Sequence, residues 1–241
     1  MLRRVWATLL LFIGVIRYMG RLATLPKRRE HMLSVKDMQG IVRMMFISDV
    51  HNNRILSRIA EEDVDFIVLG GDFVDKRVSD KTMRYNLELL KKMKKPIYFI
   101  PGNNDGEKQS TPELMEQFGV RVLSNETIEE EGYSITGIDP YSGDEVIKPE
   151  KSSIRPSFLI MHDPFLMKQM SAFAEDYDLI LSGHTHGGQI RFMDYGPYER
   201  GGWKTFEGKR VFVSEGYGTS LLPLRLETQS EYHVFVLQCE K

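Results

Sequence analysis

Carboxylate and imidazole side chains recur directly after short apolar runs of this 241-residue chain. MMFIS is followed by Asp49 and His51, which are two positions apart, so both side chains lie on the same face of an extended segment. DFIVLGG leads into Asp72, and LILSG leads into His184 and His186. Carboxylate and imidazole groups are ligands of divalent transition metals. This pattern therefore indicates metal chemistry.

Two more apolar runs end in the same way. IYFIPG precedes Asn103, Asn104 and Asp105, SFLIM precedes His162, and Asp75 follows in the loop after DFIVLGG. Taken singly, each cluster is explained by turn residues or by a structural histidine. Four of the six histidines, however, follow apolar runs and recur together with three acidic or amide clusters. That co-occurrence favours a shared metal site.

The apolar runs themselves predict the strands that position these side chains. They lie at residues 41–47, 65–70, 97–100, 133–137, 157–161 and 178–182. Open α/β sheets place their sites at the carboxyl ends of such strands. Residues 79–94 carry apolar side chains at helical spacing and predict a helix that ends before Pro96. Alternation over residues 210–214 and 232–238 favours a mixed sheet.

Composition restricts the classes of protein. Hydrophobic residues make up 41% of the chain and charged residues 27%, which is typical of a globular protein. The formal net charge of -2 makes nucleic acid an unlikely partner. The only cysteine, Cys239, cannot form a disulfide within the chain.

The N-terminal residues predict contact with a membrane. Residues 5–16 are free of charge and lie between Arg3 and Arg4 on one side and several basic residues on the other. We therefore expect a membrane-directed segment at 1–22 and a basic linker at 23–40. The denser positive charge on the C-terminal flank favours a cytoplasmic catalytic domain. Export through a signal-like N-terminus is an alternative, as is a helix packed into the core, and the sequence leaves open whether the segment spans, anchors or is cleaved.

Five ordered motifs carry a resemblance to a known family. They are Asp-x-His at 49–51, Gly-Asp-x-x-Asp at 71–75, Gly-Asn-x-Asp at 102–105, His162, and Gly-His-x-His at 183–186. In this order the chain resembles the calcineurin-like metallophosphoesterase superfamily. The strings GHTHGGQIR at 183–191 and GYGTSLLPLR at 216–225 are similar to a bacterial branch that is tethered to membranes. The resemblance implies an α/β fold over residues 41–241, a four-layer αββα sandwich of two mixed β-sheets flanked by helices.

The resemblance also implies a dinuclear site. It assigns one metal to Asp49, His51 and His186, the other to Asn103, His162 and His184, and the bridging position to Asp72. Two divalent ions would supply an activated hydroxide for cleavage of a phosphodiester or phosphoanhydride, and the donor set favours Mn, Fe or Zn. Asp75 and Asp105 would orient the ligands.

One position departs from the family pattern. The superfamily usually has a phosphate-contacting histidine where this chain has Asn104. An amide can hydrogen-bond a phosphoryl oxygen, but it cannot act as a general acid near neutral pH. We therefore expect Asn104 to contact phosphate and the enzyme to prefer substrates whose leaving group needs little protonation.

Substrate specificity has a candidate segment at residues 192–209. Phe192, Tyr195, Tyr198 and Trp203 could hold a base, a sugar or an acyl chain, or could simply pack under a loop. Relatives in the tethered branch include hydrolases of nucleotide-linked lipid precursors, so a nucleotide-linked or lipid-proximal phosphate substrate is the expectation. A non-catalytic scaffold on the same fold and a nuclease are the alternatives.

Overall fold

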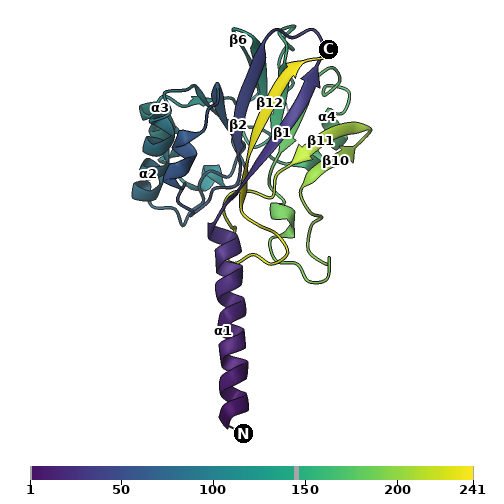
Figure 1. Ribbon diagram of the computed structural model, residues 1–241. Helices are drawn as coiled ribbons and strands as arrows, with labels where there is room; N and C mark the ends of the chain where they lie inside the picture. Colours follow the sequence, from purple (N-terminus) through teal and green to yellow (C-terminus); the bar gives the residue numbers. More distant parts are fainter. Residues whose placement is uncertain (1, 144–146, 241) are drawn as a thin grey trace.

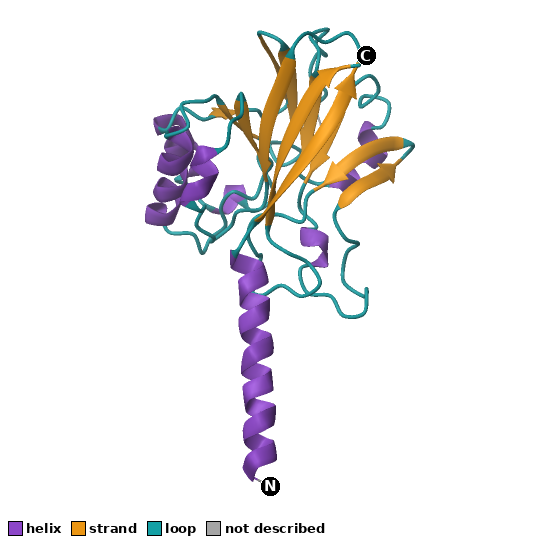
Figure 2. Cartoon of the chain, viewed as in Figure 1, coloured by secondary structure: helices purple, strands orange, loops and turns teal. Residues whose placement is uncertain are grey.

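The computed structural model describes residues 2–143 and 147–240 of the chain. Two six-stranded sheets form its centre (Figures 1 and 2). The first sheet has the order β1 (Lys27–Val35), β12 (Glu231–Cys239), β2 (Ile41–Ile47), β3 (Phe66–Leu69), β4 (Ile97–Phe99) and β5 (Arg121–Val122). The second has the order β10 (Gly202–Phe206), β11 (Lys209–Val213), β9 (Leu179–Ser182), β8 (Ser157–Met161), β7 (Tyr133–Ile138) and β6 (Glu126–Glu130).

Helices cover the outer faces of both sheets. The first sheet packs against α2 (Asp80–Lys91), α3 (Thr111–Gln117) and the 3-10 helix η1 (Ser57–Glu61), and the second packs against η3 (Pro164–Leu166) and α4 (Met167–Met170). One apolar cluster lies between the sheets and two lie under the helices. Parallel and antiparallel pairs occur in each sheet. The predicted four-layer α/β architecture is confirmed.

The helix predicted at 79–94 is α2. Ser79 caps its N-terminus by accepting a hydrogen bond from the Thr82 N–H. Met83, Leu87 and Leu90 are fully buried on its inner face, as their spacing requires. α2 ends at Lys91, three residues earlier than expected.

Strand direction determines which elements meet at the site. β2, β3 and β4 run parallel, so the C-terminal ends of all three lie along one edge of the first sheet, across the strands. β12 is antiparallel to β2 and β1 is parallel to β12, so the N-terminal ends of β1 and β12 lie along that same edge. Two further short helices lie near these strand ends, η2 (Asp105–Glu107) and η4 (His186–Gly188).

The interpretation of residues 23–40 as a basic linker is wrong for its central part. Residues 27–35 form β1, which pairs with β12 from Lys27 opposite Glu231 to Val35 opposite Cys239. Because β1 is an edge strand, its many charged side chains remain in water, and this composition hid it in the sequence. His31 therefore lies in a sheet, where its ring stacks on Phe235.

The N-terminal segment forms the single long helix α1 (Leu2–Thr24). By length and composition, residues Arg3–Thr24 could cross a membrane, and only 6% of the apolar window is buried. The alternative of a helix packed into the core is therefore wrong. α1 projects as a rod from the domain, and only its last turns touch the domain, through Met19 and Ala23 (Figure 1).

Candidate dinuclear metal centre

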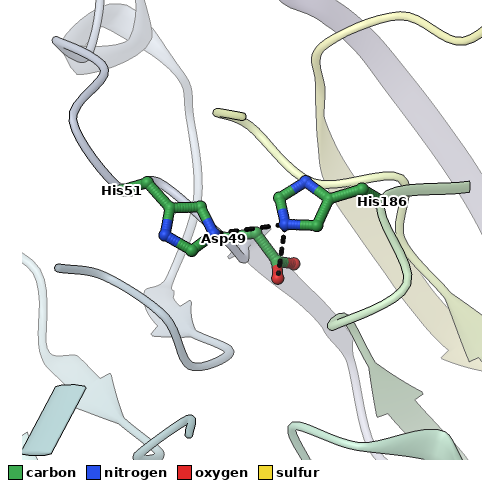
Figure 3. A group of neighbouring side chains, drawn as sticks. All are labelled: Asp49, His51 and His186. Carbon is green, nitrogen blue, oxygen red and sulfur yellow. Dashed lines mark hydrogen bonds and ion pairs between the residues drawn. The ribbon is translucent and has the colours of Figure 1, made fainter. Parts of the chain in front are cut away.

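The first group of candidate ligand atoms comes from Asp49, His51 and His186. His51 Nε2 lies 3.1 Å from His186 Nε2, which in turn lies 3.5 Å from Asp49 Oδ1 (Figure 3). Neighbouring ligand atoms that each stand about 2.1 Å from one cation are roughly 3.0 to 3.4 Å apart. All three side chains are buried. The group could hold a cation away from bulk solvent.

The second group comes from Asp72, His162 and His184, whose ligand atoms lie within 4.8 Å of one another. His184 Nδ1 lies 2.9 Å from Asn103 Oδ1, so Asn103 adjoins this group as the sequence predicts. His162 Nδ1 lies 2.9 Å from the Gly70 carbonyl oxygen. A carbonyl only accepts, so Nδ1 carries a proton and Nε2 faces the site.

Asp72 lies between the two groups. Its Oδ2 atom is 3.4 Å from His162 Nε2 and 3.8 Å from His51 Nε2. A carboxylate in this position can contact a cation in either group. This is the placement that the bridging assignment requires.

The buried Nε2 atom of His162 indicates that the donor atoms of the two candidate groups suit a divalent metal. The Nε2 atom is buried and forms no hydrogen bond of good geometry among the described residues, although the Asp72 and Asp49 carboxylates lie 3.4 and 3.9 Å away. A buried polar atom without a partner is costly unless something else binds it. Imidazole nitrogen beside carboxylate and amide oxygen suits a divalent transition metal.

The electrostatics of the site also favour positive charge. Burial alone lowers the pKa of His162, but the carboxylates of Asp72 and Asp49 outweigh this effect and raise the pKa to about 10. Burial alone raises the pKa of Asp72, but contact with His162 lowers it well below its usual range, so this carboxylate stays ionised. Burial, together with the charges of Arg225 and His51, lowers the pKa of His186 to about 3 and keeps that ring neutral, which is the form that binds a metal, whereas His162 would have to release its Nε2 proton to bind one.

Glycines give the candidate ligand residues room. A Cβ added to Gly183 would lie 2.4 Å from Asp49 Oδ2, and one added to Gly71 would lie 2.4 Å from His162 Nδ1. The candidate ligand residues take unusual backbone conformations, since φ is positive at Asp49, His51, Asp72, His184 and His186. Non-glycine residues rarely adopt this region, and they cluster there at functional sites. The strand ends thus turn sharply and direct their side chains toward one point.

Asp105 and Asp75 contact residues of the two candidate groups, Asp72 and His51. Asp105 accepts hydrogen bonds from the backbone N–H groups of Asp72 at 2.8 Å, Gly102 at 2.7 Å and Val74 at 3.0 Å. Burial and nearby Asp72 raise the pKa of Asp105 to about 7, against the effect of the Val74 and Gly102 N–H groups. Through these three hydrogen bonds Asp105 connects the loop after β3 to the loop after β4.

Asp75 supports the first group. Its Oδ2 atom lies 3.2 Å from His51 Nδ1, and Arg77 forms a salt bridge with the same carboxylate. Burial alone raises the pKa of Asp75, but His51 and Arg77 outweigh it and lower the pKa well below its usual range. An ionised Asp75 beside Nδ1 favours a tautomer of His51 with a free Nε2.

The aromatic residues of segment 192–209 separate into different surroundings. Tyr198 lines the cleft beside the candidate metal groups, together with Asn103, Asn104 and His184. Trp203 packs against Phe212 and Arg210, away from this cleft. The other two are exposed side chains. Of the four, Tyr198 is the one that lines this cleft.

Asn104 lies at the rim of the same cleft. Its backbone N–H donates to Asp72 Oδ1 at 2.8 Å and its side-chain amide donates to Asp72 Oδ2 at 2.6 Å. The structure thus places Asn104 beside the candidate bridging carboxylate. Its contact with phosphate remains a prediction.

Arg225 is a residue that the sequence analysis missed. Its guanidinium is fully buried and donates to the carbonyl oxygens of Glu215, Gly218 and His186. Burial lowers its pKa to about 10, so it remains charged at neutral pH. Arg225 lies in the string 216–225 that carried part of the resemblance, but an arginine in a loop gives no sign that it will be buried.

Comparison with known proteins gives the family. A model described as calcineurin-like phosphoesterase matches residues 42–188, more than half of the chain. The uncharacterized protein YpbG of Bacillus subtilis is 32% identical over 226 residues, which cover 87% of this chain and 86% of YpbG. The phosphodiesterase YaeI of Escherichia coli is 26% identical over 84% of each chain. A transmembrane protein with metallophosphoesterase domain from Danio rerio is 29% identical over 82% of this chain and 53% of that protein.

Two facing mixed sheets with two adjoining groups of imidazole and carboxylate atoms at one edge define a hydrolase of the metallophosphatase class. The chain belongs to the calcineurin-like phosphoesterase family. It is therefore an enzyme that acts on phosphoric ester or anhydride bonds, and the superfamily expected from the motifs is confirmed.

Proposed function

We propose that this chain is a dinuclear metal-dependent phosphohydrolase that cleaves a phosphodiester or a phosphoanhydride. The observation that carries the proposal is the position of Asp72 Oδ2, within 3.4 Å of His162 Nε2 and 3.8 Å of His51 Nε2. Asp49 Oδ1 also lies near a histidine of each group, 3.5 Å from His186 Nε2 and 3.9 Å from His162 Nε2, but of these two carboxylates Asp72 is the one that lines the cleft.

Seven residues would hold the metals. Asp49, His51 and His186 would bind one, Asn103, His162 and His184 the other, and Asp72 both. When bound, two divalent cations supply a hydroxide at neutral pH and neutralise charge on the phosphoryl group. Manganese, iron and zinc suit this donor set, because four imidazoles are softer than the all-oxygen shell that magnesium prefers.

The chain's own residues would position the substrate. One hydrogen of the Asn104 amide donates to Asp72 Oδ2, and the second would point toward a phosphoryl oxygen in the cleft. Asp105 and Asp75 would keep Asp72 and His51 in place. The leaving group would lie in a cavity that adjoins the cleft. A 460 Å³ cavity lined by Phe165, Tyr198, Lys204, Phe206 and others shares Tyr198 with the cleft.

The character of this cavity supports an organic substrate group. Phe165 lies 6.1 Å from the Tyr198 ring and 6.0 Å from the Phe206 ring, so aromatic faces line the walls. Lys204 also lines the cavity, where its Nζ lies 2.8 Å from Glu199 Oε2. Aromatic walls suit a nucleotide-linked group or an aryl ester better than a short alkyl alcohol.

Membrane association through α1 is part of the proposal. The helix could span a membrane by length and composition, and one similar protein is described as a transmembrane protein. The basic flank after residue 16 supports a cytoplasmic location of the catalytic domain.

Metal dependence tests the proposal directly. We expect the full-length protein, purified in mild detergent, to contain about two transition-metal ions per chain and to hydrolyse bis-p-nitrophenyl phosphate. Chelation should reduce the rate by about 100-fold or more, and manganese should restore it. Unchanged turnover of the chelated protein, with metal content verified by mass spectrometry, would contradict the mechanism.

Asn104→His tests the expected preference for good leaving groups. A histidine here adds a group that can protonate an alkoxide, so hydrolysis of an alkyl phosphomonoester should rise about 10-fold or more relative to a phosphoanhydride. Asn104→Gln is the matched control, because it keeps an amide and adds no acid. An unchanged ratio of the two rates in Asn104→His would show that the amide does not set the preference.

A further inference from the structure

Six exposed apolar side chains stand on two neighbouring loops. Phe192 is 68% exposed, Tyr195 84% and Leu221 80%. The full set is Ile190, Phe192, Met193, Tyr195, Leu221 and Leu222. Other exposed large apolar side chains of the domain are spread over separate elements, such as Met32 on β1 and Tyr85 on α2. A concentration on two loops indicates an interaction surface.

Hydrogen bonds join these loops to each other and to the cleft. Ile190 pairs with Leu226 in a short bridge. The Gln189 amide donates to the Leu222 carbonyl oxygen at 3.0 Å and accepts from the Ser220 N–H at 2.9 Å. Gln189 and Ser220 also line the cleft beside the candidate metal groups. The apolar surface is therefore part of the cleft's rim.

One of these loops, the one that carries Leu221 and Leu222, also touches the end of α1. The Arg225 N–H donates to the Met19 carbonyl oxygen at 3.1 Å, and the Ser230 N–H donates to the Leu22 carbonyl oxygen at 2.9 Å. In Figure 1 the loop that follows η4 extends from the domain in the same direction as α1. The helix, the apolar loops and the cleft thus share one edge of the molecule.

The length of the uncharged run in α1 determines how close this edge comes to a bilayer. Residues 5–16 extend about 18 Å at 1.5 Å per residue, which is less than the roughly 30 Å of hydrocarbon in a bilayer. Met19, which accepts the Arg225 hydrogen bond, follows Arg17 by only two residues. If the run lies in the hydrocarbon, the edge must lie in the headgroup layer. Exposed Arg17, Tyr18 and Arg21 suit that layer.

The backbone groups at the tip of the loop 190–195 are hydrogen-bonded within the protein, so the tip can lie where little water is present. Phe192 and Tyr195 exchange hydrogen bonds between their N–H and carbonyl groups. The Glu227 carboxylate accepts from the N–H groups of Met193 and Asp194 at 3.0 and 3.1 Å. Satisfied backbone groups reduce the cost of leaving water. The charge of Asp194 limits insertion of the tip to the headgroup layer.

We propose that Ile190, Phe192, Met193, Tyr195, Leu221 and Leu222 form a membrane-docking surface. Its partner is the headgroup layer of the bilayer that holds α1, with anionic lipid attracted by Arg17 and Arg21. Docking holds the mouth of the cleft against the membrane surface. α1 thereby acts as one of two contacts, and the second contact sets the orientation of the domain.

Spin-label accessibility tests the docking without relying on catalysis. Cys239→Ser removes the only native thiol, and single cysteines are then placed by Met193→Cys, Leu222→Cys and Met32→Cys. Met32 is the matched control, since it is 57% exposed, as is Leu222, but lies on β1 outside the surface. In full-length protein in phosphatidylcholine and phosphatidylglycerol bilayers, labels at 193 and 222 should be more accessible to oxygen than to a water-soluble nickel complex, and the label at 32 the reverse.

A charged variant separates docking from insertion of α1. Leu221→Asp combined with Leu222→Asp should return the label at 193 to the water-like accessibility of the label at 32. A label at Ile13→Cys should remain buried in the bilayer in both backgrounds. Two results would overturn the proposal. One is water-like accessibility of the labels at 193 and 222 in the protein without the aspartates. The other is an accessibility of the label at 193 that does not change when the two aspartates are introduced.

Discussion

Asp72→Asn is expected to lower the hydrolysis of bis-p-nitrophenyl phosphate by about 10³-fold or more while the protein stays folded. The substitution replaces a negative oxygen by an amide N–H at the point between His51 and His162. An N–H cannot bind a cation, so both metals lose a shared ligand and one negative charge. The measurement is the rate at saturating manganese, together with the metal content.

The fold should tolerate this change for a local reason. Asp72 has a φ of 50°, and asparagine is one of the few residues that adopts this left-handed region easily. Asp37→Asn is the matched control, because Asp37 also has a positive φ, 57°, but is exposed in the turn after β1. Full activity of Asp37→Asn beside an inactive, folded Asp72→Asn supports the bridging role. Substantial turnover by Asp72→Asn would refute it.

Much of the site could be predicted because it lies at strand ends. The apolar runs of β2, β3, β4, β8 and β9 are buried and nearly continuous, so the sequence marks each strand and the polar residues that follow it. Parallel neighbours then bring these residues to one edge. Local pattern and global topology agree here, and the prediction follows from both.

β1 and the burial of Arg225 could not be predicted, because both depend on tertiary contacts that leave no pattern in the local sequence. β1 is an edge strand whose outer side faces water, so its charged sequence KRREHMLSV resembles a linker until β12 pairs with it. Arg225 is buried only because the carbonyl groups of three separate loop residues converge on its guanidinium. Hydrophobic periodicity cannot reveal either feature.

The positions of the aromatic residues in segment 192–209 could not be predicted from the sequence either. The sequence marks Phe192, Tyr195, Tyr198 and Trp203 as candidates for substrate contact, but their distances from the candidate metal groups depend on the path of a loop. The tight turn at Phe192–Tyr195 directs two of them outward, while Trp203 enters β10 and packs on Phe212. Only the fold distinguishes a substrate contact from a surface side chain.

Gly183→Ala is expected to remove one of the two metals and to reduce turnover by about 10²-fold to 10³-fold. The added Cβ would lie 2.4 Å from Asp49 Oδ2 and 2.8 Å from the Ser48 side chain, closer than real Cβ contacts occur. Asp49 cannot simply withdraw, because its N–H donates to the Gly71 carbonyl oxygen and its carboxylate accepts from the His184 N–H. The carboxylate must therefore rotate away from His186.

Backbone strain does not contribute to this expected effect, because the φ of Gly183 lies outside the left-handed region. The steric effect of the added methyl group is therefore the only change that Gly183→Ala makes. Gly106→Ala is the matched control, since a Cβ there meets nothing within 4 Å although Gly106 lies in η2, directly after Asp105. Metal content should fall from about two ions to about one in Gly183→Ala and stay at about two in Gly106→Ala. Two bound ions in both variants would show that Asp49 is not needed for metal binding, and the first candidate group would then have to be reassigned.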